Sequence, residues 1–318
     1  MIRALEPVET EIGRISDPRE RLLAFARERH SIYLRRKKLR PFGQIVGPDI
    51  PDDDSQLSRP GKKVVWTADP ILQQYRFCNV YRELDRVTVW VRENWREPHC
   101  DDPDLWFAML VARFVNWPET LEQLGYPVPW NPIRFLTTMA LRKRNKVKSY
   151  GGAYMIRADS GTPGRGTAEY QEAAMFTPFG GQRESLRPKG GVTLNSYHML
   201  LGQLYGLGSF MAAQIVADLM YAPSLLKAED WWTFAASGPG SRRGLNRVLG
   251  RPVKSPWAEE EWRMELGRLR DWFNERWPFD IGGGVDVLHA QDVQNVLCEF
   301  DKYERVRLGE GRPRARFP

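Results

Sequence analysis

Apolar residues recur at steps of three and four along much of the chain, and the clearest run lies between residues 71 and 95. This spacing places the apolar side chains of the run on one side of an α-helix, as a helix with one buried face requires. The run therefore predicts a single amphipathic helix, whose buried face consists of Phe77, Val80, Leu84, Val87 and Val91.

Helical spacing also appears in most of the remaining chain. We expect helices over residues 17–39, 104–115, 118–124, 132–145, 210–221, 241–249, 257–275 and 286–303, and another that begins at about residue 194. No segment shows the alternation of apolar and polar residues that is typical of β-strands, and no internal repeat is present. The sequence therefore predicts an all-α protein.

Composition divides the chain into a short N-terminal part and a long helical part. Residues 1–63 hold a basic helix and a loop rich in Gly, Pro and Asp, and residues 64–318 hold the other predicted helices. Within the long part, residues 157–191 are rich in Gly, Pro, Ser and Thr and have little periodicity. This composition predicts a long, mobile insertion.

The charge balance indicates a polyanionic partner. The 318 residues include 47 Lys and Arg against 40 Asp and Glu, a formal net charge of +7, and the sequence pI is about 9.3. The three cysteines form no Cys-x-x-Cys pair, so a structural zinc site, an iron–sulfur cluster and a closed set of disulfides are not expected. No apolar run reaches the roughly 18 residues of a membrane span and no signal peptide is evident, so we expect a cytoplasmic protein without a membrane partner.

Residues 204–210 have the form of a helix-hairpin-helix turn between two predicted helices. Glycines permit the tight turn, and backbone N–H groups at the start of the second helix can hold a DNA phosphate. The alternative is an ordinary turn between helices with a glycine at the C-cap. The predicted DNA-binding residues are Gly206, Leu207, Gly208 and Ser209.

A second glycine-rich segment, residues 238–244, places Arg242 and Arg243 beside a predicted helix start at Ser241. Guanidinium groups grip phosphate oxygens through paired hydrogen bonds, so this segment is a candidate phosphate site. It is not a P-loop, because no Gly-Lys-Ser/Thr ends it, and none occurs elsewhere in the sequence. The alternative is a solvated basic turn.

Polar residues follow one stripe of the last predicted helix at steps of four, four and three: Gln291, Asn295, Glu299 and Lys302. An amide together with a carboxylate can read the edge of a pyrimidine or orient an amine. The alternative is an exposed face with a Glu299–Lys302 ion pair.

The helix predicted over residues 71–95 raises the same question. Its polar residues form either a surface network or a set of groups that faces a substrate. The residues concerned are Arg76, Asn79, Arg82, Asp85 and Arg86.

Residues 194–250 resemble the helix-hairpin-helix DNA glycosylases. In that group a catalytic aspartate follows the hairpin helix, and Asp230 stands at the matching place. The hairpin lysine of the bifunctional enzymes is absent, with Ser209 and Phe210 in its vicinity, so lyase chemistry is not expected. The resemblance implies a glycosylase-like arrangement of two helical lobes. The alternative for Asp230 is an N-cap of a helix that begins at Trp231.

Longer strings carry a second resemblance, which extends from about residue 29 to residue 314. They are similar to the helical-domain family named for phage 5-hydroxymethyluridine DNA kinases. The same group includes the predicted α-glutamyl/putrescinyl thymine pyrophosphorylases, also described as amino acid:DNA transferases. The strings are residues 66–70, 75–87, 240–244 and 292–303.

This family resemblance implies a step in the hypermodification of thymidine in phage DNA. The substrate would be double-stranded DNA in which 5-hydroxymethyluracil carries a pyrophosphate. An amino acid or polyamine would displace the pyrophosphate from the 5-methylene group, with or without Mg²⁺, after the base has left the stack. A 5-hydroxymethyluridine DNA kinase is an implied partner, and the host cytoplasm is the implied location.

In this interpretation Asp230 and Glu299 are the catalytic carboxylates, either as general base or as electrostatic support for the methylene group. No metal ligands are predicted. Two alternatives remain: a DNA glycosylase acting on a modified uracil, and a non-catalytic DNA-binding partner of the kinase. The predicted substrate-binding residues are Arg76, Asn79, Arg82, Arg86, Arg242, Arg243, Gln291, Asn295 and Lys302.

Overall fold

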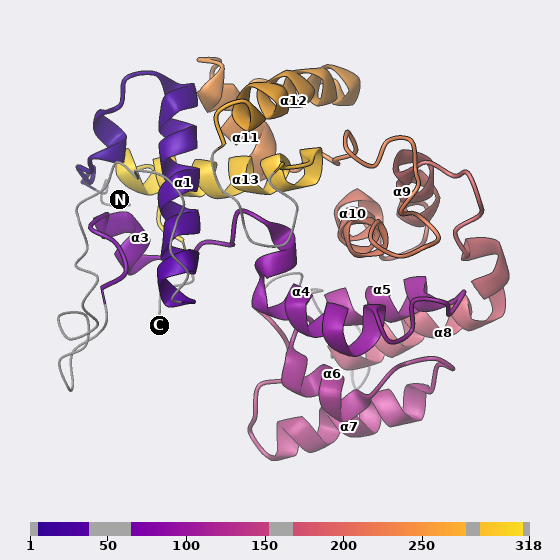
Figure 1. The fold of residues 1–318 in the computed structure, drawn as a ribbon. Coiled ribbons are helices and arrows are strands. Elements are labelled where there is room, and N and C mark those ends of the chain that lie inside the picture. Colours follow the sequence, from indigo (N-terminus) through magenta and orange to yellow (C-terminus); the bar gives the residue numbers. More distant parts are fainter. Residues whose placement is uncertain (1–5, 38–64, 153–167, 278–286, 314–318) are drawn as a thin grey trace. The chain divides into compact units, whose positions relative to one another are not determined.

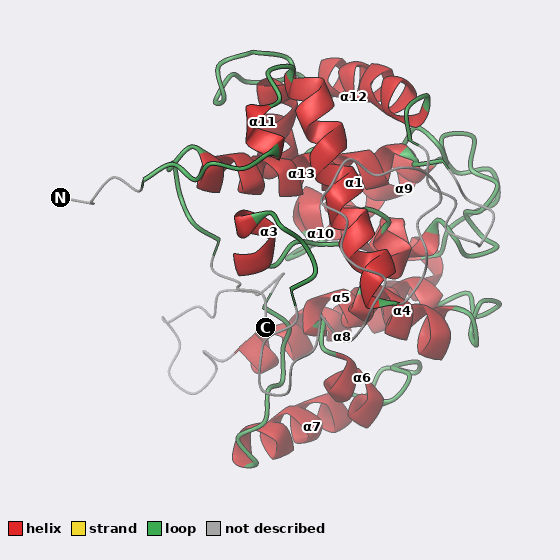
Figure 2. Cartoon of the chain, turned by 60° about the vertical axis from the view of Figure 1, so that its left-hand side comes forward, coloured by secondary structure: helices red, strands yellow, loops and turns green. Residues whose placement is uncertain are grey.

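The computed structural model describes residues 6–37, 65–152, 168–277 and 287–313 (Figure 1). The regular elements of these residues are helices, without a strand, so the predicted all-α class is confirmed (Figure 2). Among the described helices, none combines the length and apolar character that a membrane span needs. The chain divides into two compact units, Met1–Leu84 with Ser237–Pro318 and Asp85–Ala236, and each is described by itself.

The first unit is organised around its last helix, α13, which packs against α1, α3, α11 and α12 (Figure 1). Val293, Leu297 and Phe300 of α13 are fully buried among these helices. The elements of this unit are η1 (Ile12–Arg14), α1 (Pro18–Arg36), α3 (Pro70–Gln74), η2 (Arg82–Leu84), α11 (Pro239–Val248), α12 (Glu259–Asn274) and α13 (Ala290–Arg307).

Helices α11 and α13 approach closely because glycines of α11 face α13. A Cβ atom added at Gly244 would lie 2.2 Å from the carbonyl oxygen of Leu297, and one at Gly240 would lie 2.4 Å from Cys298 Sγ. The glycine-rich segment 238–244 therefore lets two helix backbones meet, and α11 already begins at Pro239 rather than at Ser241.

The second unit surrounds α5, of which every residue is buried. Arg113 of α5 forms a buried ion pair with Asp218 of α10 and also donates to Thr88 Oγ1 at 3.0 Å, so neither charge is left uncompensated. The elements of this unit are α4 (Arg86–Val91), η3 (Arg92–Arg96), α5 (Leu105–Val115), α6 (Pro118–Leu124), α7 (Pro132–Arg144), α8 (Ala168–Leu186), α9 (Leu194–Gly202) and α10 (Gly208–Leu219).

The single helix predicted over residues 71–95 is wrong. Helix α3 ends at Gln74, an irregular segment follows, and α-helix resumes only at Arg86. The backbone N–H groups of Cys78 and Arg82 donate to side chains of α13 instead of to a preceding helical turn. Three apolar residues of the pattern, Phe77, Val80 and Val91, are still buried, but by tertiary packing rather than on one helix face, whereas Leu84 and Val87 are half-buried.

A helix, α8, occupies part of segment 157–191, for which the sequence predicted no regular structure. It contains Pro178 and two glycines, residue types of low helix propensity. Phe176 and Phe179 of α8 are buried in the core of the second unit, and this burial outweighs the propensity. Residues 157–167 of the predicted insertion lie outside the described residues.

Candidate functional site

Side chains of α13 hold the backbone of residues 78–82. The carboxylate of Glu299 accepts the Cys78 N–H at 2.9 Å, and Asn295 Nδ2 donates to the carbonyl oxygen of Asn79 at 3.2 Å. These contacts join residues more than 200 positions apart in sequence. The polar face of the last helix thus binds the chain's own backbone.

Asp292 and His289 form a buried pair beside these contacts. Asp292 Oδ1 accepts the Arg82 backbone N–H at 3.0 Å, and Oδ2 lies 3.3 Å from His289 Nε2. His289 Nδ1 accepts the Asp292 N–H at 3.2 Å, which places the ring proton on Nε2, facing the carboxylate. Burial raises the pKa of Asp292, while His289 and the Arg82 N–H act in the opposite direction. Neither residue was predicted, although a histidine and an aspartate three positions apart at a helix start were a visible signal.

The polar stripe of α13, defined as Gln291, Asn295, Glu299 and Lys302, is largely buried. Gln291 is 3% exposed and Glu299 8% exposed, while Asn295 and Lys302 are half-buried. The alternative of an exposed face is therefore wrong, although the Glu299–Lys302 ion pair is present.

Two amide oxygens of this stripe accept no hydrogen bond from the described part of the chain. Gln291 Nε2 donates to Gln294 Oε1 at 3.1 Å, but the buried Oε1 of Gln291 has no donor there. Asn295 uses Nδ2 on the backbone, and its Oδ1 has no donor among the same residues. A buried polar atom without a partner costs about 1–3 kcal/mol, so Gln291 Oε1 is suited to accept an N–H group of a ligand.

Asn79, a predicted substrate-binding residue, is bonded within the protein. Its Oδ1 accepts from Arg29 Nη2 at 2.7 Å, and its Nδ2 donates to the carbonyl oxygen of Leu84 at 2.7 Å. Both ends of the amide therefore fix the irregular segment.

The three predicted arginines of residues 76–86 do not share a helix face. Arg76 is exposed and Arg82 is 8% exposed, both in the first unit. Arg86 belongs to the second unit, where it is exposed and forms an ion pair with Glu119.

Arg242 is anchored at the start of α11. Its guanidinium donates to Ser237 Oγ at 2.7 Å and to Glu259 Oε2 at 2.9 Å. Burial alone would raise the pKa of Glu259, but hydrogen bonds from Ser237 and Arg242 outweigh it and lower the pKa. The Arg242 side chain remains 37% exposed.

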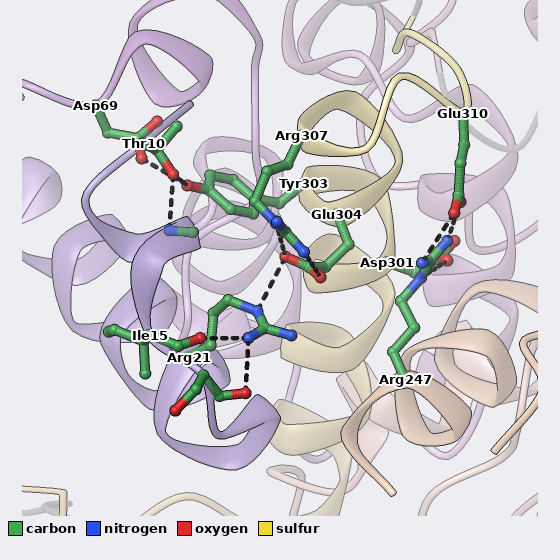
Figure 3. Close-up of polar contacts among 12 residues, drawn as sticks. Thr10, Ile15, Arg21, Asp69, Arg247, Asp301, Tyr303, Glu304, Arg307 and Glu310 are labelled. Carbon is green, nitrogen blue, oxygen red and sulfur yellow. Dashed lines mark hydrogen bonds and ion pairs between the residues drawn. The ribbon is translucent and has the colours of Figure 1, made fainter. Parts of the chain in front are cut away.

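Arg243 contributes to a cationic cluster around Asp301, a residue without exposed surface. Arg243 and Arg247 donate to the Asp301 carboxylate at 2.9 and 3.0 Å, and Arg305 Nε lies 3.3 Å from it. Figure 3 shows Arg247 between Asp301 and Glu310. About one third of the Arg243 side chain, 34%, is exposed, and this part would contact a phosphate in the predicted role.

The last turns of α13 are also tied to residues of the N-terminal part of the first unit (Figure 3). Tyr303 donates to Asp69 Oδ2 at 2.6 Å, and its oxygen lies 2.7 Å from Thr10 Oγ1. Glu304 accepts from Arg307 at 2.7 Å and lies 3.3 Å from Arg21 Nε. These contacts fix the rotation of α13 and therefore the direction of its polar stripe.

The hairpin of the second unit has a sharp turn that depends on glycine. Gly206 and Gly208 have φ angles of 86° and 57°, in the left-handed region. A Cβ at Gly206 would lie 2.1 Å from Met175 Sδ. Leu207 is buried. It is also the N-cap residue of α10 and offers no side-chain acceptor, so the first backbone N–H groups of α10 must find acceptors elsewhere.

Asp230 binds the start of α9, the first helix of the hairpin. Its two carboxylate oxygens accept the backbone N–H groups of Leu194 and Asn195 at 2.7 and 2.9 Å. The aspartate therefore caps α9, not a helix at Trp231, where the chain forms turns. The carboxylate is half-buried.

The predicted site residues thus lie in two places. Asp230, Arg86 and the hairpin residues Gly206, Leu207, Gly208 and Ser209 belong to the second unit, and the other predicted residues belong to the first. Within the described residues, no cluster of His, Cys, Asp and Glu has an arrangement that could hold a metal ion.

Comparison with known proteins identifies the family. The family model described as "5-hmdU DNA kinase, helical domain" matches residues 55–312. A 5-hmdU DNA kinase of Bacillus phage SP10 is 23% identical over 270 residues, which cover 76% of this chain and 41% of that protein. No solved structure matches the chain. Because the family model spans most of the sequence, the chain belongs to the family of 5-hmdU DNA kinase helical domains.

Proposed function

We propose that this protein acts on 5-hydroxymethyluracil in DNA and transfers an amine to the pyrophosphate-activated 5-methylene group. Family membership supports the DNA base, because the phage relative is a 5-hmdU DNA kinase. The observation that carries the proposal is the polar stripe of α13, where the buried Gln291 Oε1 without a donor accompanies a carboxylate–ammonium pair.

The reaction makes one bond and breaks one. The amine nitrogen bonds to the methylene carbon, the carbon–oxygen bond to pyrophosphate breaks, and the pyrophosphate leaves with the electron pair. The nitrogen also loses a proton, so a base is required. Positive charge that develops on the methylene carbon is stabilised by a nearby carboxylate.

Asp230 suits the role of base or electrostatic partner. Each of its oxygens accepts one backbone N–H and keeps a further lone pair, and the carboxylate is half-buried rather than sealed. Within the first unit, taken by itself, Gln291 and Asn295 would accept N–H groups of a bound ligand. Glu299 would hold their supporting segment in place.

The hairpin would hold the DNA backbone beside the flipped nucleotide. Its glycine turn presents the N–H groups at the start of α10, and a phosphate can accept them. This contact would offset part of the few kcal/mol needed to extrude a base.

Mass spectrometry of nucleosides tests the proposal. The protein is incubated with DNA that contains pyrophosphorylated 5-hydroxymethyluracil and a mixture of amino acids and polyamines. An amine-adduct nucleoside is expected with the wild type and with the neighbouring control Glu229→Gln, and its loss is expected with Asp230→Asn. Thermal denaturation of each variant separates loss of chemistry from loss of fold.

The other outcomes identify the alternatives. Free base together with abasic DNA would show a glycosylase and overturn the transferase. Unchanged DNA in every reaction would overturn the transferase and favour a binding partner without catalytic activity.

A further inference from the structure

The C-terminal turn of α7 carries a concentration of positive charge that the candidate site does not use. Residues 132–149 contain six Lys and Arg and no Asp or Glu. Residues 143–148 are exposed throughout. We call residues 142–148 the basic turn.

The basic turn has a fixed shape. Arg142 is 8% exposed, and its guanidinium donates to the carbonyl oxygens of Lys148 and Glu119 at 2.6 and 3.1 Å and to Gln123 Oε1 at 3.1 Å. The chain reverses at Lys146, which has a φ of 55°. The buried arginine therefore organises the turn and leaves the exposed cations outside.

These exposed cations are not neutralised by the described part of the chain. Lys143, Arg144 and Lys146 form no ion pair with it, and Lys148 Nζ lies 3.9 Å from the centroid of the Trp117 ring. The neighbouring helix α6 contributes two carboxylates, one of which is paired with an arginine. The local balance stays strongly positive.

Stabilisation of the helix itself does not account for this charge. A helix C-terminus is equivalent to about half a negative charge, which one cation offsets. Like charges held close together repel each other, so a surface of this kind stabilises the protein only when an anion neutralises it. The remaining charge suits an extended anion.

We propose that the basic turn binds the phosphate backbone of double-stranded DNA without regard to sequence. The partner follows from charge complementarity: duplex DNA presents one phosphate per roughly 1.7 Å of its axis, which several cations on one turn can contact together. The inference deepens the proposed function, because a DNA-modifying protein needs affinity for DNA beyond the modified base.

The salt dependence of binding to unmodified duplex DNA tests this inference. Fluorescence anisotropy measures Kd between about 50 and 200 mM salt for the wild type and for Lys143→Gln/Arg144→Gln/Lys146→Gln. Each lost phosphate contact reduces the steepness of the plot of log Kd against log salt concentration by about 0.9. We therefore expect the slope of this plot to fall by about two to three, and Kd to rise at least about tenfold. Arg142 is left intact so that the turn keeps its shape.

A control variant with the same net charge separates the basic turn from a general charge effect. Arg14→Gln/Lys254→Gln/Arg268→Gln removes three exposed cations of the first unit and should leave the slope close to that of the wild type. An unchanged slope in the basic-turn variant, or equal losses in both variants, would overturn the inference. Because the duplex lacks the modified base, this result is independent of adduct formation, which tests the proposed function separately.

Discussion

Replacement of Gly244 by alanine tests how α11 positions α13. The added Cβ would lie 2.2 Å from the carbonyl oxygen of Leu297 and 2.8 Å from its carbonyl carbon, whereas ordinary contact begins at 3.4 Å. Both atoms belong to the backbone of a buried helix, so no side-chain rotation can relieve the clash. The two helices must separate by roughly 1 Å.

The expected loss of stability is about 2 kcal/mol. Overpacking of a well-filled core costs about 1–3 kcal/mol, and the better helix propensity of alanine returns at most about 1 kcal/mol. Gly267 in α12 provides the matched control, because a Cβ there meets no atom within 4 Å. Gly267→Ala keeps only the gain in propensity and should stabilise the protein by up to about 1 kcal/mol.

Urea denaturation of both variants, followed by circular dichroism, measures the difference. Hydrogen exchange of peptides from α13 should also accelerate in Gly244→Ala, because the helix loses its fit against α11. Equal shifts of the urea midpoint in the two variants would refute the close approach of α11 and α13.

Three further predictions concern carboxylates. Burial raises the pKa of Glu172 to about 8, and the hydrogen bond with Tyr150 has a weaker, opposing effect. As pH rises, Glu172 therefore ionises earlier in the unfolded chain than in the folded protein. The free energy of unfolding should fall between pH 4.5 and about 8. Glu172→Gln should remove this fall in stability with pH. If the urea midpoints of the variant and the wild type depended equally on pH, the prediction would be wrong. Asp301→Asn leaves its surrounding arginines without a buried anion and should cost about 3–5 kcal/mol in thermal denaturation. Glu310→Gln, on a carboxylate 42% exposed, should cost less than about 1 kcal/mol, and similar losses for the two would argue against a buried cluster. Asp230→Asn replaces one acceptor oxygen at the start of α9 by a donor and should cost about 1 kcal/mol, while an unchanged melting temperature would disprove the cap.

The helices that the sequence predicted well have local start signals. Asp17, Trp117 and Asn131 each precede a proline at the first position of a helix, and the helices that follow begin where expected. In α5 a continuous apolar run also fixes the position. These elements depend on neighbours in sequence, so they could be read without knowledge of tertiary contacts.

The failures arise where distant groups decide the structure. The break after Gln74 depends on Glu299 and Asp292, whose partners lie more than 200 residues away. Helical spacing of apolar residues cannot reveal that a backbone N–H will find an acceptor on another helix. The polar stripe of α13 was predicted from the helical spacing of its polar residues. That spacing did not reveal that the stripe is buried or that it binds residues 78–82.

The division of the chain has a consequence for its synthesis. Residues Asp85–Ala236 form one unit, whereas the other unit combines Met1–Leu84 with Ser237–Pro318. A ribosome that adds 5–20 residues per second completes α13 roughly 4–14 s after the last residue of the inserted unit. During that interval Cys78 and Arg82 have no acceptors from α13, so a nascent chain can fold its hairpin before the polar stripe exists.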